Sequence, residues 1–302
     1  MFEKLKAKIL FGKLLSRPNI NKAYAMVGPE DSWYNTIKKV HDSLEEIQKL
    51  PHEILEIKSS DGTLLRGIYY PAAEKSDKTV ICIHGFGSHA EREWAFPGLF
   101  YHSLGFNVLI PYQRAHGLSE GEKITFGVLE SFDMINWVGE VNKITPDGKI
   151  LIHGLSMGGG IALLLSASSE LIGVKGIISD APSTGAEAFF KNVSREVFGR
   201  NGDKVAAYAI EDLNKYIEDL NKYTGRDIKN FNSLEAVKNS AFPILLSAGS
   251  MEGLEDMFIE IKKSNPCDTE IVILDGCNHG NGMYKQTEVY QTKIKEFICK
   301  YF

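Results

Sequence analysis

The segment at residues 149–160, KILIHGLSMGGG, combines an apolar run with a serine set between glycines. Its part GLSMG, at 154–158, fits GxSxG, a pattern that exposes the central serine when a strand turns sharply into a helix. Such a turn strains the serine backbone, and side chains at the two glycine positions would collide with neighbouring elements. The context therefore predicts that Ser156 is a nucleophile presented at the end of a strand.

A serine hydroxyl needs a base to remove its proton, and histidine is the most frequent one. His279 stands in the segment NHG, after the apolar run EIVIL at 270–274 and before a C-terminal helical pattern. The chain has eight histidines, so the residue type alone means little. Its place last in the chain order serine, acid, histidine makes His279 the predicted base for Ser156.

Two carboxylates compete for the role of the acid that orients His279. Glu252 follows the run PILLSAG at 243–249, in the loop after the strand expected to precede the one that carries the histidine. Asp180 ends the run GIISD and also lies between Ser156 and His279 in the chain. The position of its loop makes Glu252 the preferred acid, and Asp180 remains the alternative.

A second loop is expected to complete the site. His84 and Gly85 open this loop directly after the buried run TVICI at 79–83. A loop in this position contributes one N–H group to an oxyanion hole, and the residue after the nucleophile contributes another. The backbone N–H groups of Phe86 and Met157 are therefore predicted to bind the negative oxygen that develops during attack, at about 3 kcal/mol for one donor.

The pattern of apolar residues predicts the strands and helices that position these side chains. TVICIHG, FNVLIPY, KILIHG, VKGIISD, FPILLSAG and TEIVILDG are continuous aliphatic runs, and most are separated by segments of helical periodicity. Such runs indicate strands buried on both faces of a parallel sheet. Upstream, HEILEIKS and TLLRGIYYP flank the turn SSDG and predict an antiparallel hairpin. The sequence thus predicts an α/β fold with its sites at the carboxyl ends of the strands.

Three regions are expected along the chain. Residues 1–50 read as a charged, helical N-terminal extension, and residues 51–182 with 241–302 form the α/β core. Residues 183–240 contain no strand pattern and are polar and helical, which predicts a helical cap inserted into the core. The apolar positions of the first helix fall at helical spacing between lysines, so we expect that helix to pack on the protein's own body.

Composition excludes several classes of protein. With 302 residues, 43% of them hydrophobic, the chain can bury a sizeable core, and its net charge of −5 does not favour nucleic-acid binding. No CxxC pair suggests a metal, and the four cysteines read as reduced thiols of a cytoplasmic protein. Four lysines interrupt the N-terminal segment, and no later stretch is long and apolar enough to span a membrane. The oligomeric state is not readable from the sequence.

These motifs together resemble the α/β-hydrolase superfamily, particularly bacterial intracellular serine esterases and serine-aminopeptidase-like proteins. The resemblance rests on SSDGTLLRGIYYP, IHGFGSHAEREW, PYQRAHGLSEGEKITFG, GLSMGGG and NHG, whose order and spacing match from residue 52 to 302. It implies a mostly parallel eight-stranded sheet with helices on both faces, a helical cap and a Ser–acid–His triad without a cofactor or metal. Two positions depart from the family: Glu252 stands where aspartate is usual, and Tyr112 where many relatives have aspartate.

The expected function is hydrolysis of a carboxylic ester of small to medium size, partly apolar, through an acyl-enzyme. Ser156 would attack, His279 would transfer the proton, and Glu252 would orient His279. A thioester, a small amide or a peptide would suit the same triad. A ligand-binding homologue without catalysis is the alternative from another class.

Overall fold

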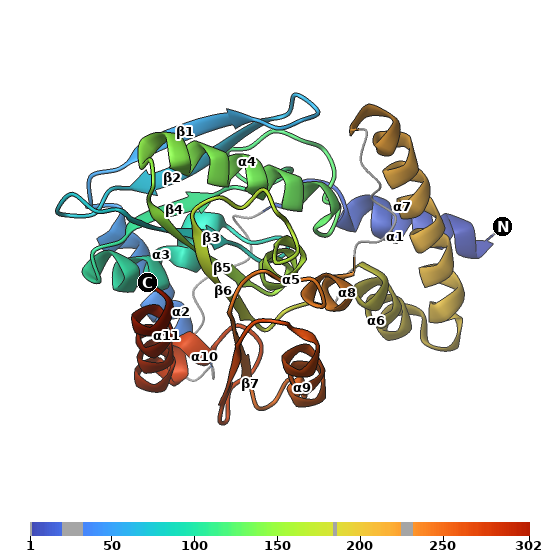
Figure 1. Ribbon diagram of the computed structural model, residues 1–302. Helices are drawn as coiled ribbons and strands as arrows, with labels where there is room; N and C mark the ends of the chain where they lie inside the picture. Colours follow the sequence, from blue (N-terminus) through green and yellow to red (C-terminus); the bar gives the residue numbers. More distant parts are fainter. Residues whose placement is uncertain (1, 20–32, 184–185, 225–231) are drawn as a thin grey trace.

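An eight-stranded sheet with the order β1-β2-β4-β3-β5-β6-β7-β8 runs through the computed structural model, which describes residues 2–19, 33–183, 186–224 and 232–302 (Figure 1). β1 pairs with β2 and β2 with β4 antiparallel, whereas the pairs from β4 to β8 are parallel. The predicted hairpin and the mostly parallel sheet are confirmed. The strands are β1 (Glu53–Lys58), β2 (Leu64–Tyr70), β3 (Lys78–Ile83), β4 (Asn107–Pro111), β5 (Lys149–Leu155), β6 (Val174–Asp180), β7 (Ile244–Gly249) and β8 (Thr269–Leu274).

The continuous aliphatic runs form strands because both faces of the sheet are covered. In β3, Val80 and Cys82 belong to one buried cluster, and the alternate residues Ile81 and Ile83 belong to the other. Successive side chains of a strand point to opposite faces, so a strand between two cores needs apolar residues at nearly every position.

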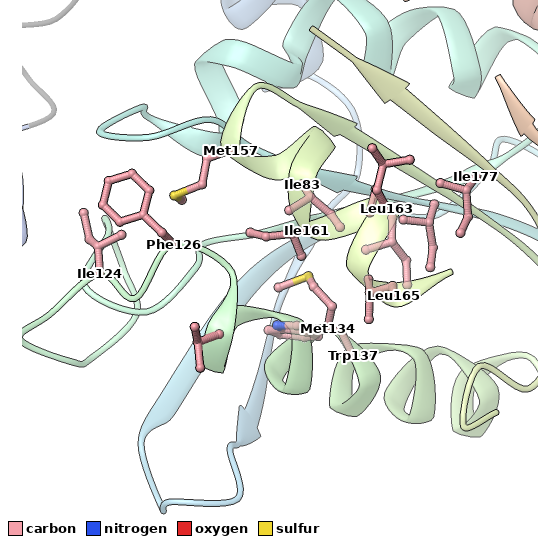
Figure 2. Packing of buried hydrophobic residues seen from close by; sticks show 14 of the residues in the cluster. Ile83, Ile124, Phe126, Met134, Trp137, Met157, Ile161, Leu163, Leu165 and Ile177 are labelled. Atoms are coloured by element: carbon pink, nitrogen blue, oxygen red, sulfur yellow. The ribbon is translucent and has the colours of Figure 1, made fainter. Parts of the chain in front are cut away.

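Helices cover the two faces as predicted. Buried residues of α4 (Val128–Ile144), α5 (Met157–Leu165) and α9 (Glu255–Ser264) belong to one cluster, part of which Figure 2 shows with Trp137 of α4 and Ile161 of α5. Residues of α2 (Tyr34–Ile47), α3 (Ala90–Ser103), α10 (Gly282–Lys285) and α11 (Thr287–Tyr301) belong to the other. The core therefore has two layers separated by the sheet.

Helices also fill the segment between β6 and β7, where a cap was expected. They are α6 (Ala186–Phe198), the short 3₁₀ helix η2 (Gly199–Asn201), α7 (Gly202–Thr224) and α8 (Ser233–Val237). Residues 184–185 and 225–231 of the expected cap lie outside the described part of the chain. The domain boundaries therefore stay a prediction.

The first fifty residues contribute to two separate places. α1 (Phe2–Leu14) packs against α7 and crosses it at one end of the molecule, as Figure 1 shows, and Ala7 and Phe11 of α1 are buried. α2 instead packs on α3, on the opposite face of the sheet, with Val40 and Ile47 buried. The expectation that the first helix packs on the protein's own body is confirmed for this face of α1, whereas Leu5 and Ile9 are exposed.

Candidate active site

Ser156 lies on the sharp turn between β5 and α5. Its backbone has φ 58° and ψ −114°, a conformation that non-glycine residues rarely adopt. A Cβ atom on Gly154 would lie 2.0 Å from the carbonyl oxygen of Gly158, and one on Gly158 would lie 2.0 Å from that of Ile83. Neither position therefore has room for a side chain, so both must be glycine. The strained turn lifts the serine hydroxyl above the end of the sheet.

His279 comes from the loop between β8 and α10 and lies beside the serine. Its Nε2 is 2.9 Å from Ser156 Oγ, a normal hydrogen-bond distance. The imidazole is largely accessible, with 58% of the side chain exposed. The structure thus brings together two residues 123 positions apart, in a geometry that lets the imidazole accept the hydroxyl proton.

Glu252 lies on the other side of the imidazole. Its Oε2 is 2.6 Å from His279 Nδ1, and its Oε1 accepts a hydrogen bond of 2.8 Å from the N–H of Gly249. Only 8% of its side chain is exposed. The hydrogen bond that His279 donates to Glu252 is the largest cause that raises the pKa of His279, because a carboxylate stabilises the imidazolium form.

Asp180 points elsewhere. Its carboxylate accepts hydrogen bonds from the hydroxyl of Tyr290 and from His153 Nε2, the latter at 3.1 Å, and His153 Nδ1 is 2.7 Å from the hydroxyl of Tyr101. All four groups are buried. The backbone carbonyl of Asp180 also accepts from the N–H of Ser156 at 2.9 Å. The alternative acid is thus part of a buried network beneath the site and supports the serine turn through its backbone.

The loop predicted to donate an oxyanion N–H runs directly past the serine. A Cβ atom on Gly85 would lie 3.4 Å from Ser156 Cβ, and Phe86 is the next residue. Met157 is the first residue of α5, where an N–H group has no acceptor within the helix. The two predicted donors therefore belong to chain segments that lie next to the serine.

Two neutral histidines hold this loop. His116 Nε2 accepts from the N–H of Gly87 at 3.1 Å, and His84 Nε2 accepts from the N–H of Gln113 at 3.1 Å. Burial is the largest cause that lowers the pKa of both His84 and His116, which keeps these rings neutral and able to accept. Gln113 Nε2 also donates to the carbonyl of His84 at 2.5 Å. The segment after β4 therefore fixes the segment after β3.

Sequence reasoning missed one buried carboxylate at this loop, Glu93 of α3. Its Oε1 accepts from the N–H of Gly85 at 2.7 Å, and the residue is 7% exposed. A glutamate in the first turn of a helix normally faces solvent. Nothing in the segment HAEREW shows that this one turns inward, so no local signal could have found it.

An aromatic surface borders the same loop. The ring of Phe86 lies 5.2 Å from that of Phe126 and 5.2 Å from that of Phe189, which are 4.7 Å apart. Phe86 and Phe189 are only partly buried. Aromatic side chains from α6 and from the loop before α4 thus pack against Phe86, the residue next to Gly85, and form an apolar surface there.

Neither a metal-binding cluster nor a membrane-spanning helix occurs within the described ranges. No group of three or more His, Cys, Asp or Glu side chains is placed there to hold a metal ion. Within the same residues, no helix combines the length and the apolar character needed to cross a bilayer.

A serine on a sharp turn after the fifth strand of a mostly parallel eight-stranded sheet defines the α/β-hydrolase fold. A family model described as alpha/beta hydrolase fold matches residues 78–212. The chain thus has the α/β-hydrolase fold.

Individual relatives support this assignment. Rat monoglyceride lipase is 29% identical over 258 residues, 77% of this chain and 84% of the lipase. YqkD of Bacillus subtilis is 33% identical over 143 residues, 47% of this chain and 46% of YqkD. The chain spans less than half the length of YqkD and of several other curated relatives that it matches. The structure of an esterase from Pyrococcus furiosus has a TM-score of 0.64 and 20% identity, with 95% of this chain and 98% of that chain covered, and supports the fold.

Proposed function

We propose that this protein is a serine hydrolase that cleaves a carboxylic ester through an acyl-enzyme intermediate. The observation that carries the proposal is the unbroken line of contacts from Glu252 to His279, at 2.6 Å, and from His279 to Ser156, at 2.9 Å. Relatives described as esterase and monoglyceride lipase agree with this class of reaction.

The proposed first step is acylation. His279 Nε2 removes the proton of Ser156 as its Oγ bonds to the ester carbonyl carbon, and the imidazolium is stabilised by Glu252. The N–H groups of Phe86 and Met157 bind the oxyanion of the tetrahedral intermediate. The intermediate collapses when His279 gives its proton to the departing alcohol. Water then attacks the acyl-enzyme by the same route and releases the acid and Ser156.

We propose that the substrate is a small-molecule ester with an apolar part. Phe86 and Phe189 offer partly exposed rings beside the loop that borders Ser156. Because Phe189 belongs to α6, the substrate would lie between the α/β core, residues 51–182 and 241–302, and the cap at 183–240. A thioester or a small amide is the alternative substrate, since the triad itself does not discriminate among esters, thioesters and amides. The reaction as proposed uses no cofactor and takes place in the cytoplasm.

A panel of nitrophenyl esters of increasing acyl length tests the proposal. We expect turnover by the wild type and a loss of about 10⁵-fold or more in kcat for Ser156→Ala. Ser168→Ala, beyond the far end of α5, is the matched control and should behave as wild type. Equal turnover by Ser156→Ala and wild type would refute the mechanism.

Labelling with a fluorophosphonate separates the hydrolase from a non-catalytic ligand-binding protein without any choice of substrate. The proposal expects one adduct that Ser156→Ala abolishes. A protein that only binds ligands would give no adduct, or an adduct that persists in Ser156→Ala.

A further inference from the structure

Glu93 stands in the first turn of α3 with its carboxylate turned into the protein. Its Oε1 accepts from the N–H of Gly85 at 2.7 Å, and the side chain of Ser88 also hydrogen bonds to it. Both partners belong to the segment that carries Phe86. A hydrogen bond to a buried carboxylate is charge-assisted and stronger than one between neutral groups, so this contact fixes the loop firmly.

The same carboxylate lies close to the reacting groups. A Cβ atom built on Gly85 would be 3.4 Å from Ser156 Cβ and 3.5 Å from Glu93 Oε2, so both residues border this one glycine. Glu93 and His279 also interact electrostatically: each favours the charged form of the other. The imidazole that Glu252 contacts directly is therefore influenced by a second carboxylate from a different element.

We infer that Glu93 is a positioning residue of the site. Its carboxylate holds the loop after β3, which carries Phe86, through the N–H of Gly85. Its negative charge also assists Glu252 in stabilising the imidazolium of His279. This inference rests on the proposed function for its consequences in turnover. The effect on the imidazole does not depend on any substrate.

The groups around Glu93 define the sign of its effect. The loop after β3 presents the Gly85 N–H and Ser88, the loop after β8 presents His279, and Tyr284 of α10 donates to the backbone carbonyl of Glu93 at 3.3 Å. On α3 itself, Glu91 bonds elsewhere, accepting from Tyr70 and Gln48. Among the groups that shift the pKa of Glu93, His279 is the charged one.

Burial raises the pKa of Glu93 to about 7, and the hydrogen bond to Glu252 raises the pKa of His279. Because the two groups interact electrostatically, the protonation of each depends on that of the other. Above about pH 7 Glu93 is an anion that favours the imidazolium, and below it the carboxyl is neutral. Removal of its charge must lower the pKa of His279 and move the acid limb of kcat/KM to lower pH.

Three variants test the inference. Glu93→Gln keeps an acceptor for Gly85 but removes the charge, and Glu93→Ala removes both. Glu91→Gln removes the other buried carboxylate of the same turn and serves as the matched control. Its partners Tyr70 and Gln48 take no part in the contacts among Ser156, His279 and Glu252. Thermal unfolding of each variant verifies folding.

We expect the acid limb of kcat/KM to move down by about 0.5 pH unit or more in Glu93→Gln and to stay in place in Glu91→Gln. At pH 8.5, Glu93→Ala should lose roughly 10–100-fold in kcat with a smaller change in KM, because a loosened loop misplaces an oxyanion donor. If the acid limb of kcat/KM in Glu93→Gln lies at the same pH as in the wild type, the inference is overturned.

A titration of the His279 imidazole by NMR, assigned with His279→Gln, gives a readout without turnover. The pKa of His279 should fall in Glu93→Gln and stay unchanged in Glu91→Gln. If the wild type hydrolyses esters through Ser156 but neither the limb nor the imidazole moves, the inference fails and the proposed function stands. If no ester is turned over, the imidazole titration still decides the role of Glu93.

Discussion

Two carboxylates stand at the carboxyl ends of neighbouring parallel strands, and they serve different imidazoles. Asp180, the last residue of β6, contacts His153 and Tyr290 inside the protein. Glu252, three residues beyond the end of β7, contacts His279 at the surface of the site. A position at the active edge of the sheet therefore does not make a carboxylate catalytic, because the direction of its side chain decides which imidazole it contacts.

The alternation of the strand explains that direction. Ile178, two residues before Asp180, is buried in the cluster formed by α2, α3 and α11, and so is Leu151, two residues before His153. Residues i and i+2 of a strand point to the same face, so Asp180 and His153 meet on that face, below the edge. Glu252 lies in a loop free of this constraint, and its Oε1 bond to the Gly249 N–H turns the carboxylate toward His279.

The largest expected effect separates the two imidazoles. His279→Gln should lose about 10⁵-fold or more in kcat on a nitrophenyl ester, because His279 is the base in contact with the Ser156 hydroxyl. His153→Gln should keep kcat within about 10-fold, since its contacts act on structure rather than on the hydroxyl. Steady-state kinetics on the folded variants measures both. A loss of kcat in His153→Gln as large as that in His279→Gln would contradict the structural role of His153.

A substitution in the buried network around Asp180 should lower the stability of the protein rather than its turnover. Asp180→Asn keeps an acceptor for Tyr290 but loses the charge, and we expect the free energy of unfolding to fall by about 1–3 kcal/mol. Glu252→Gln, on a loop, should change it less. Urea denaturation measures the two values, and an equal or larger loss in Glu252→Gln would contradict the assignment of Asp180 to structure.

The pH dependence sharpens the role of Glu252. Its hydrogen bond raises the pKa of His279, so the neutral imidazole that acts as base forms only at a higher pH. The wild-type kcat/KM should therefore reach half its maximum above about pH 6.5. In Glu252→Gln the imidazole pKa should fall, because the carboxylate that stabilises the imidazolium is gone. NMR titration of His279 checks this, and an unchanged pKa in Glu252→Gln would show that the contact does not act on the imidazole.

The smallest expected effect concerns the aromatic surface. Phe189→Ala should lower kcat/KM about 3–10-fold for long acyl esters and little for acetate, because it removes apolar contact area beside Phe86. Phe198→Ala, at the other end of α6, is the control. The ester panel measures the ratio of long to short esters. A ratio that is unchanged in Phe189→Ala would place the acyl group elsewhere.

Much of this arrangement was predictable from the sequence. Continuous aliphatic runs predicted the parallel strands because both faces of such a sheet are buried, and the GxSxG context predicted the turn at Ser156. The chain order then favoured His279 as the base, and the position of its loop favoured Glu252 as the acid. The structure brings both together with Ser156. These features depend on local patterns and on the rule that parallel strands end at one edge.

Other features depend on contacts between distant segments and could not be predicted. Nothing near Glu93 or Gln113 in the chain indicates that both side chains hold the loop after β3. The helical pattern of residues 1–50 likewise showed that apolar stripes exist, but not that α1 packs on α7 and α2 on α3. An amphipathic stripe predicts burial without naming the surface that buries it.

The most direct test of the central claim compares kcat/KM of Glu252→Gln and Asp180→Asn on one nitrophenyl ester at pH 8. Our account predicts a loss of about 10⁴-fold for Glu252→Gln, as expected when the acid that fixes the histidine tautomer is removed, and a loss below about 10-fold for Asp180→Asn. The reverse ranking would contradict the account and assign the orientation of His279 to Asp180.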